Sequence, residues 1–519
     1  MSIPVVTVGA SREDLVGRLE RLHGPVSVVR RCNELAELLA ACQGGLARAA
    51  VVAEGSEELT ASLVDRLSAV GVAVLALTDD AEETVRLRGI GVAAEVTGVD
   101  AAALASRIAG AVALLAGADP RRPADTFSQA GARPALGALG PSGGTAEERP
   151  GRSAEGQIIA VWGPAGSPGR TMVAANMAAE LAAEGKSVLL VDADSYGASV
   201  AAMLGLLDEA AGLAQACRLA DQGLLDAEAL LRIAAPVVTR TGTFRVLTGI
   251  TRADRWTELR AAALSLVLAR ARQIVDVTVI DTGFCLESDE ELSFDTMAPR
   301  RNAATLRSLE LADTVFAVGA ADSIGVPRLV RGLAELESAV PQASPRVVLN
   351  KVRQSAVGRS PERQLRDAWE RYGPTVPLSA FLPADPVSSD AALLSGSLLL
   401  EAAPDSALRM GIAALVCAPV QRNRRSSVFS STAKRRLARC SCSGRTTCSR
   451  GATTGTGSSR KPCDRRTGSS PAKVIGTSTP TATSSPPSGA RSRPRWKPPS
   501  SRVRTSRPSS TAPTRCSRA

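Results

Sequence analysis

Residues 158–179 read IIAVWGPAGSPGRTMVAANMAA, and the fold expected for the larger part of the chain follows from them. The apolar run Ile158–Trp162 predicts a strand, and the amphipathic pattern that begins at Arg170 predicts a helix. Between them lies a loop rich in Gly and Pro. This order points backbone N–H groups and the helix dipole at an anion. Taken alone, the segment is equally compatible with a turn that binds nothing.

The end of the loop is similar to the end of a P-loop. There the last residues are Gly-Lys-Ser/Thr: the Lys reaches the β- and γ-phosphates, and the hydroxyl binds Mg²⁺. Here Gly169, Arg170 and Thr171 hold those positions, and Pro164 stands at the first motif position in place of Gly. The expected nucleotide-binding residues of the loop are Gly166, Ser167, Gly169, Arg170, Thr171 and Met172.

Two later apolar strands end in acids. Residues 187–194 read SVLLVDAD and deliver Asp192 and Asp194, while residues 275–281 read VDVTVID and deliver Asp281. Carboxylates at the carboxyl ends of parallel strands, beside a P-loop, are where Mg²⁺ and an attacking water are held. The three acids in this order favour a nucleotide site over an empty turn.

The pattern around this loop predicts an α/β domain over residues 157–420. The expected strands are Ile158–Trp162, Val188–Val191, Val275–Ile280, Thr314–Val318 and Arg346–Leu349. The expected helices include Val173–Ala183, Leu259–Ala271 and Arg328–Glu337. Strands that alternate with helices in this way predict a parallel sheet.

Residues 1–117 predict a second, smaller parallel sheet of the flavodoxin-like kind. Its expected strands are Val5–Val8, Val26–Val29, Ala49–Ala53, Val72–Leu77 and Ala93–Val96, with helices such as Arg12–Leu22 and Glu57–Ala69 between them. The pattern resembles a response-regulator receiver domain without its chemistry. Gly9-Ala10 stand in place of the acidic pair, Glu54 in place of the phosphoacceptor Asp, and Thr97-Gly98 in place of the Lys. Of the residues that receiver chemistry needs, only Thr78 is present, so we expect a pseudo-receiver that acts as an interaction module.

The rest of the chain is pattern-free. Residues 118–156 hold five Pro and predict a flexible linker. Residues 421–519 hold 23 Lys and Arg against one acid, with almost no aliphatic residues, and predict a disordered tail. Two interpretations of this tail remain open: a basic arm for nucleic acid or anionic lipid, or an out-of-frame product of GC-rich DNA.

Composition excludes several classes of function. A single His, His23, excludes a metal site built on several His, and it excludes a His-based triad unless that triad uses His23, which we expect to be a surface or capping residue. Without the tail the body is acidic, which argues against nucleic-acid binding by the body. The N-terminus lacks a signal-peptide pattern and no apolar run is long enough to span a membrane, so we expect a cytoplasmic protein.

At this point residues 157–420 resemble the MinD/ParA class of deviant Walker-A ATPases. The resemblance rests on AANMAAELAAEGKSVLLVDAD (174–194), VIDTGF (279–284), LADTVFAVGAADSIGVPRL (311–329), Asn350-Lys351-Val352 and FLPADPVSSDAALLSGSLLLEAAP (381–404). With the pseudo-receiver in front, the chain looks more like the CpaE/TadZ branch and, within it, the actinobacterial septum-site-determining (Ssd-like) proteins.

The resemblance implies ATP and Mg²⁺ as cofactors. It implies that Asp192 and Asp194 position Mg²⁺ and water as the catalytic acids, and that Asp281 takes the Walker-B role. Thr171, Asp192 and Asp281 would then be the metal ligands, and Asn350 and Pro383 would flank the adenine. It further implies an ATP-dependent homodimer, protein partners of the septum or of a Tad secretion machine, and recruitment to the cytoplasmic face of the membrane through partners.

Two departures leave the activity open. The family carries a second, signature Lys early in the loop, where this chain has Ala165. With Arg170 in place of the other Lys, ATPase activity is undecided, because Arg does not reproduce a point charge. Three functions remain: a nucleotide-dependent positioning switch, a pseudo-ATPase scaffold that binds partners without hydrolysis, and a partition-type DNA-binding protein that uses the basic tail.

Overall fold

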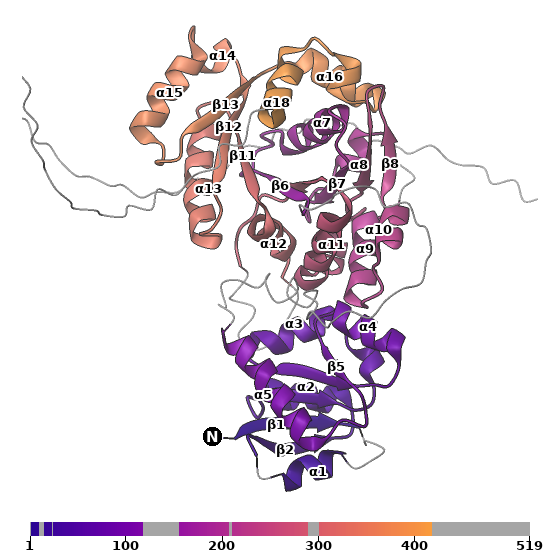
Figure 1. The fold of residues 1–519 in the computed structure, drawn as a ribbon. Helices are drawn as coiled ribbons and strands as arrows, with labels where there is room; N and C mark the ends of the chain where they lie inside the picture. The colour runs from indigo at the N-terminus through magenta and orange to yellow at the C-terminus, as the bar shows by residue number, and fades with distance from the viewer. Residues whose placement is uncertain are drawn as a thin grey trace, which may run out of the picture. The chain divides into compact units, whose positions relative to one another are not determined.

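The computed structural model describes residues 2–9, 15–22, 24–117, 155–206, 210–288 and 300–417. They build two α/β sheets, one coloured indigo to violet and one magenta to orange in Figure 1. His23, residues 118–154 of the expected linker and the whole expected tail lie outside the described residues.

The first sheet has five parallel strands in the order β2-β1-β3-β4-β5. Its strands are β1 (Ile3–Val8), β2 (Val26–Cys32), β3 (Ala49–Val52), β4 (Ala73–Leu77) and β5 (Ala93–Glu95). Its helices are α1 (Leu15–Arg21), α2 (Leu35–Gln43), α3 (Ala61–Ala69), α4 (Ala81–Gly89) and α5 (Ala101–Gly117). This strand order is that of the flavodoxin-like doubly wound fold, and all five expected strands are present.

One expected helix begins later than predicted. A helix was expected over Glu57–Ala69, but Ser56–Glu58 form a short 3₁₀ turn and α3 starts only at Ala61. The reason is a cap: the hydroxyl of Thr60 accepts a hydrogen bond from the N–H of Leu63 at 3.3 Å.

The second sheet has eight strands in the order β13-β12-β11-β6-β10-β7-β9-β8. They are β6 (Gln157–Trp162), β7 (Val188–Ala193), β8 (Ala235–Val238), β9 (Thr243–Leu247), β10 (Val277–Thr282), β11 (Thr314–Ala320), β12 (Pro345–Val352) and β13 (Leu378–Pro383). Only β8 runs antiparallel to its neighbour. The five expected strands are present, whereas β8, β9 and β13 were not predicted.

Helices cover both faces of this sheet (Figure 1). The longer ones are α7 (Arg170–Ala183), α9 (Gly212–Asp221), α11 (Ala261–Ile274), α13 (Gly325–Ala339), α15 (Pro361–Tyr372), α16 (Pro386–Ser395) and α18 (Ala407–Cys417). The shorter ones are α8 (Val200–Met203), α10 (Ala227–Ile233), α12 (Ala303–Leu311), α14 (Gln354–Val357) and α17 (Leu399–Ala402). Helix α7 is buried over Val173–Ala182, because its many Ala side chains allow close packing against the sheet.

The register of the central strands brings the sequence signals together. Strand β10 lies between β6 and β7, so Asp281 pairs with Val161 on one side and with Asp192 on the other. The loop after β6 and the acids of β7 and β10 therefore meet at one edge of the sheet, the carboxyl edge.

Candidate nucleotide site

The loop between β6 and α7 requires glycine at its turns. Gly166 has φ +113° and Gly169, the residue that caps α7, has φ +96°. A Cβ atom on Gly169 would lie 2.6 Å from Nδ2 of Asn350, and one on Gly166 would lie 2.6 Å from Nη1 of Arg328. Ser167, between them, adopts φ +54° without being glycine. The loop is thus held tightly against the ends of β12 and α13.

Arg170 turns its guanidinium back onto the start of the loop. Nη1 donates to the carbonyl oxygens of Gly163 at 2.9 Å and Pro164 at 3.4 Å, and Nη2 donates to Oδ2 of Asp194 at 3.2 Å. Both partners of the ion pair are largely buried. In this arrangement Arg170 ties the loop to the end of β7.

Asp281 is the most unusual acid of the site. It is 1% exposed, and neither carboxylate oxygen has a hydrogen-bond partner among the described residues. Burial, and then the nearby charge of Asp192, raise the pKa of Asp281 well above its ordinary value, although the neighbouring Thr171 hydroxyl and Arg170 charge act in the opposite direction. Two unpartnered oxygens in a buried position are expensive, and a bound cation would offset that cost.

The residues around Asp281 fit Mg²⁺ together with a phosphate. Mg²⁺ in such sites is held by one or two carboxylates, a hydroxyl and substrate phosphates. The hydroxyl of Thr171, at the start of α7, lies 3.3 Å from that of Ser199 and could serve as such a ligand. Among the residues that the structure describes, no three or more His, Cys, Asp or Glu gather as a metal cluster, so phosphate oxygens would have to complete the shell.

Asp192 and Asp194 have partners, unlike Asp281. Oδ2 of Asp192 accepts from the N–H groups of Ser199 at 2.9 Å and Val200 at 3.0 Å, which anchors the start of α8. Oδ1 of Asp194 accepts from the N–H of Tyr196 at 2.8 Å. Burial raises the pKa of Asp192 to about 6, although these hydrogen bonds act in the other direction. Asp192 therefore anchors the start of α8, and its role as a metal ligand stays a prediction.

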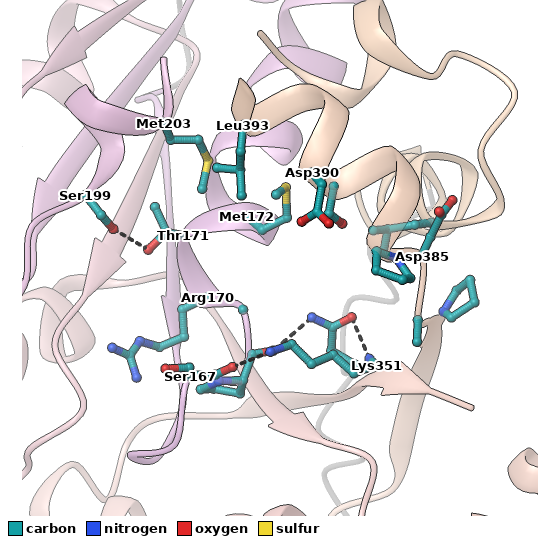
Figure 2. Close-up of a pocket in the computed structure, with 18 of the residues that line it drawn as sticks. Ser167, Arg170, Thr171, Met172, Ser199, Met203, Lys351, Asp385, Asp390 and Leu393 are labelled. Atoms are coloured by element: carbon teal, nitrogen blue, oxygen red, sulfur yellow. Dashed lines mark hydrogen bonds between the residues drawn. The ribbon is translucent and has the colours of Figure 1, made fainter. Parts of the chain in front are cut away.

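A cavity of about 680 Å³ opens beside the loop. In Figure 2 the loop and the start of α7 form one wall, and the ends of β12 and β13 with α16 form the facing wall. The residues of the loop wall include Ser167, Pro168, Gly169, Arg170, Thr171 and Met172. The facing wall includes Asn350, Lys351, Arg353, Pro383, Asp385, Asp390 and Leu393.

Most of the expected site residues line this cavity. Asp194 joins Ser167, Gly169, Arg170, Thr171, Met172, Asn350 and Pro383 there. Gly166 is not among the lining residues, and neither are Asp192 and Asp281, which lie buried at the strand ends. Asn350 acts on the loop itself, because its Nδ2 donates to the carbonyl oxygen of Pro168 at 2.8 Å.

The sequence pattern did not single out Lys351, Asp385 or Asp390 as site residues. Lys351 carried a signal of its own: it is one of only two Lys outside the tail. Asp385 follows Pro383 and caps α16, where its Oδ1 accepts from the N–H of Ser388 at 3.0 Å. No local pattern placed these side chains opposite the P-loop-like turn.

Comparison with known proteins finds a family similar to one segment of the chain. Residues 155–229 match the ParA family, described as NUBPL iron-transfer P-loop NTPase. That match covers β6, the loop, α7 and the acids of β7. These residues are therefore similar to a ParA-type P-loop NTPase, and they also form the strand–loop–helix unit described above. No curated protein matches the chain.

Several solved structures are similar to about half of the chain at low identity. The cell-division ATPase MinD of Pyrococcus furiosus is 21% identical, with a TM-score of 0.39, and the match covers 50% of this chain and 97% of that one. A ParA-family ATPase from Chlorobium tepidum is 19% identical, with a TM-score of 0.42, and the match covers 51% of this chain and 99% of that one. MinD of Pyrococcus horikoshii, complexed with Mg-ADP, is 20% identical, with a TM-score of 0.39, and the match covers 50% of this chain and 94% of that one.

Proposed function

We propose that the domain built on the eight-stranded sheet binds Mg-ATP in the cavity beside the loop. The observation that carries this proposal is the pair of unpartnered, buried oxygens of Asp281 next to the first turn of α7. The loop N–H groups and the helix dipole supply the attraction for phosphate. Asp281 and the hydroxyl of Thr171 would hold the Mg²⁺, while Asn350 and Pro383 would flank the base.

Bound nucleotide would work as a switch for positioning. By its resemblance to the CpaE/TadZ branch and Ssd-like proteins, we infer an ATP-dependent homodimer that marks the site of a septum or of a Tad-type pilus or secretion machine. The five-stranded sheet would serve as a pseudo-receiver that docks a protein partner. The protein would work in the cytoplasm and reach the membrane face through that partner. Among the described residues, no helix combines the length and apolar character that crossing a bilayer requires.

Calorimetric titration of the full chain with ATP, with and without Mg²⁺, tests the binding proposal. We expect saturable binding that Mg²⁺ strengthens, and Asp281→Ala should weaken the Mg²⁺-dependent binding at least about tenfold. Asp254→Ala is the matched control, because Asp254 is an exposed acid paired with Arg252 at 3.3 Å. The absence of binding at millimolar ATP, or equal losses in both variants, would contradict the proposal.

A second candidate is a pseudo-ATPase scaffold, favoured by the contacts of Arg170. The guanidinium is tied to two loop carbonyls and to Asp194, so it is not poised over a phosphate. A single-turnover assay separates the two candidates. The switch predicts Mg²⁺-dependent hydrolysis that Asp194→Asn reduces, whereas the scaffold predicts binding without turnover. The third candidate, DNA binding by the tail, concerns residues outside the described part of the chain.

A further inference from the structure

The cavity beside the loop contains a positive charge that the loop does not supply. P-loops place a Lys against the phosphates of the nucleotide. This loop has Arg170 at that position and Ala165 at the signature position. The cation of the site must therefore be found by its geometry.

Arg170 is poorly placed for that task. In Figure 2 its guanidinium points away from Lys351, and it donates hydrogen bonds to Gly163, Pro164 and Asp194. To reach a phosphate in the cavity it would have to leave all three acceptors, one of which is a buried carboxylate. Breaking a buried ion pair is unfavourable, because it leaves the partner charge without compensation.

Lys351 reaches the loop from the facing wall. It follows Asn350 at the end of β12, and its Nζ donates to the carbonyl oxygen of Ser167 at 2.7 Å (Figure 2). This carbonyl takes one of the three donors of the ammonium group, so the same group can also contact an anion in the cavity. Lys351 is exposed and lines the cavity.

The backbone holds Lys351 in that position. Among the described residues that are not glycine, only Ser167 and Lys351 have positive φ, at +54° and +60°, and the Lys351 hydrogen bond joins the two. Asn350 fixes the turn, because its Oδ1 accepts from the N–H of Lys351 at 2.8 Å while its Nδ2 holds Pro168. Strained residues of this kind persist where the surrounding structure over-determines them, and they gather at ligand sites.

Arg353 and Arg328 are weaker candidates. Arg353 also lines the cavity, but its Nη1 donates to the carbonyl oxygen of Lys351 at 3.1 Å and so supports the same turn. Arg328 lies against Gly166 and is not among the residues that line the cavity.

We propose that Lys351 is the phosphate-binding cation of this site, supplied by the end of β12 in place of the missing loop lysines. Its ammonium would contact the polyphosphate of a bound nucleoside triphosphate, while Arg170 ties the loop to Asp194. This inference rests on the proposed nucleotide binding.

Titration of the full chain with ATP, ADP and AMP tests the proposal. Lys351→Gln keeps the length and polarity of the side chain and removes its charge. We expect it to weaken ATP binding roughly 10- to 100-fold, ADP binding less and AMP binding least, because a charge-assisted hydrogen bond to phosphate is lost. The dependence of ATP affinity on salt should fall as well.

Two further variants make the result decisive. Lys351→Asn removes the charge at a position with positive φ, which Asn tolerates well, so it separates the loss of charge from misfolding. Lys186→Gln is the matched control, an exposed Lys that pairs with Glu184 at 3.6 Å. Wild-type protein that binds no ATP would remove the proposed function itself. If the wild-type protein binds ATP and both Lys351→Gln and Lys351→Asn bind it with the same affinity, only the role of Lys351 would be overturned.

Discussion

The carboxyl edges of the two sheets differ in how their acidic side chains are placed. At the edge of the five-stranded sheet Glu54 and Asp79 are exposed, and Asp79 accepts hydrogen bonds from both the N–H and the hydroxyl of Thr97. At the edge of the eight-stranded sheet Asp281 is buried and its oxygens have no partner among the described residues. Both sheets carry acids after the carboxyl ends of parallel strands, but these acids are solvated in one sheet, whereas the other sheet holds a costly buried carboxylate.

The approach of the loops differs as well. In the five-stranded sheet Gly9 follows β1, and a Cβ atom there would lie 2.6 Å from both the Cβ and the backbone nitrogen of Glu54. Gly9 thus lies directly against Glu54, whereas the loop after β6 borders a cavity of about 680 Å³. A parallel sheet offers a place for a ligand only where its loops leave room and its acids lack other partners.

The largest effect should come from adding a methyl group at the two tight glycines. We expect Gly9→Ala and Gly169→Ala each to destabilise their own sheet by about 2–3 kcal/mol, since both combine positive φ with a contact at 2.6 Å. Hydrogen exchange read on peptides of each sheet measures this loss. Only Gly169→Ala should also weaken ATP binding.

Gly45→Ala is the control for backbone strain without a clash. Gly45 has φ +73° but nothing lies within 4 Å of the place of a Cβ atom, so we expect Gly45→Ala to destabilise the sheet by about 1 kcal/mol. Equal losses in all three variants would show that the close contacts do not matter.

A smaller effect of opposite sign is expected for the two acids. Without ligand, Asp281→Asn should raise the melting temperature at pH 8. The substitution removes a buried charge without partners, which destabilises the folded protein by roughly 1–3 kcal/mol. Asp79→Asn should lower it slightly, because a charged acceptor of Thr97 is lost. Differential scanning calorimetry in EDTA measures both.

The Asp281 effect should depend on pH in a defined direction. The folded protein holds the proton of Asp281 to a higher pH than the unfolded chain, since the pKa is raised on folding. The contribution of Asp281 to the free energy of unfolding therefore falls as the pH rises from about 4 through the pKa that Asp281 has in the folded protein. The advantage of Asp281→Asn should grow from pH 5 to pH 8, and an advantage that shrinks over this range would contradict the assignment.

The smallest effect concerns phosphorylation of the five-stranded sheet. Incubation with acetyl phosphate and Mg²⁺ should leave Glu54 and Asp79 unmodified, because neither forms part of a buried acidic pair. Peptide mass spectrometry reads the result. A phosphorylated carboxylate at either position would show a working receiver and remove the contrast between the two edges.

The fold was predictable wherever strands are buried on both sides. Strand β4 is buried along its full length and β6 beyond its first residue, so both read as continuous apolar runs. Strands β8 and β13 lie at the two sides of the larger sheet, each contains a Pro, and both are only partly buried, so their sequences carry no clear period. They were missed for that reason.

The candidate site was predictable where function follows from a local motif. Gly169, Arg170 and Thr171 stand in a recognisable order, and Asp281 ends an apolar strand. The hydrogen bond from Lys351 to Ser167 joins residues 184 positions apart, and neither residue type signals the other.

The sequence by itself determined the apolar strands, the glycine turn before α7 and the acids at the strand ends. These follow from local physics: side-chain periodicity, the left-handed conformations that favour glycine, and the cost of burying polar groups. Only the tertiary structure decided that Asp281 pairs in register with Asp192, that Arg170 is tied to Asp194, and that Lys351 faces the cavity. Those contacts depend on strand order and register, which arise from the packing of the whole sheet.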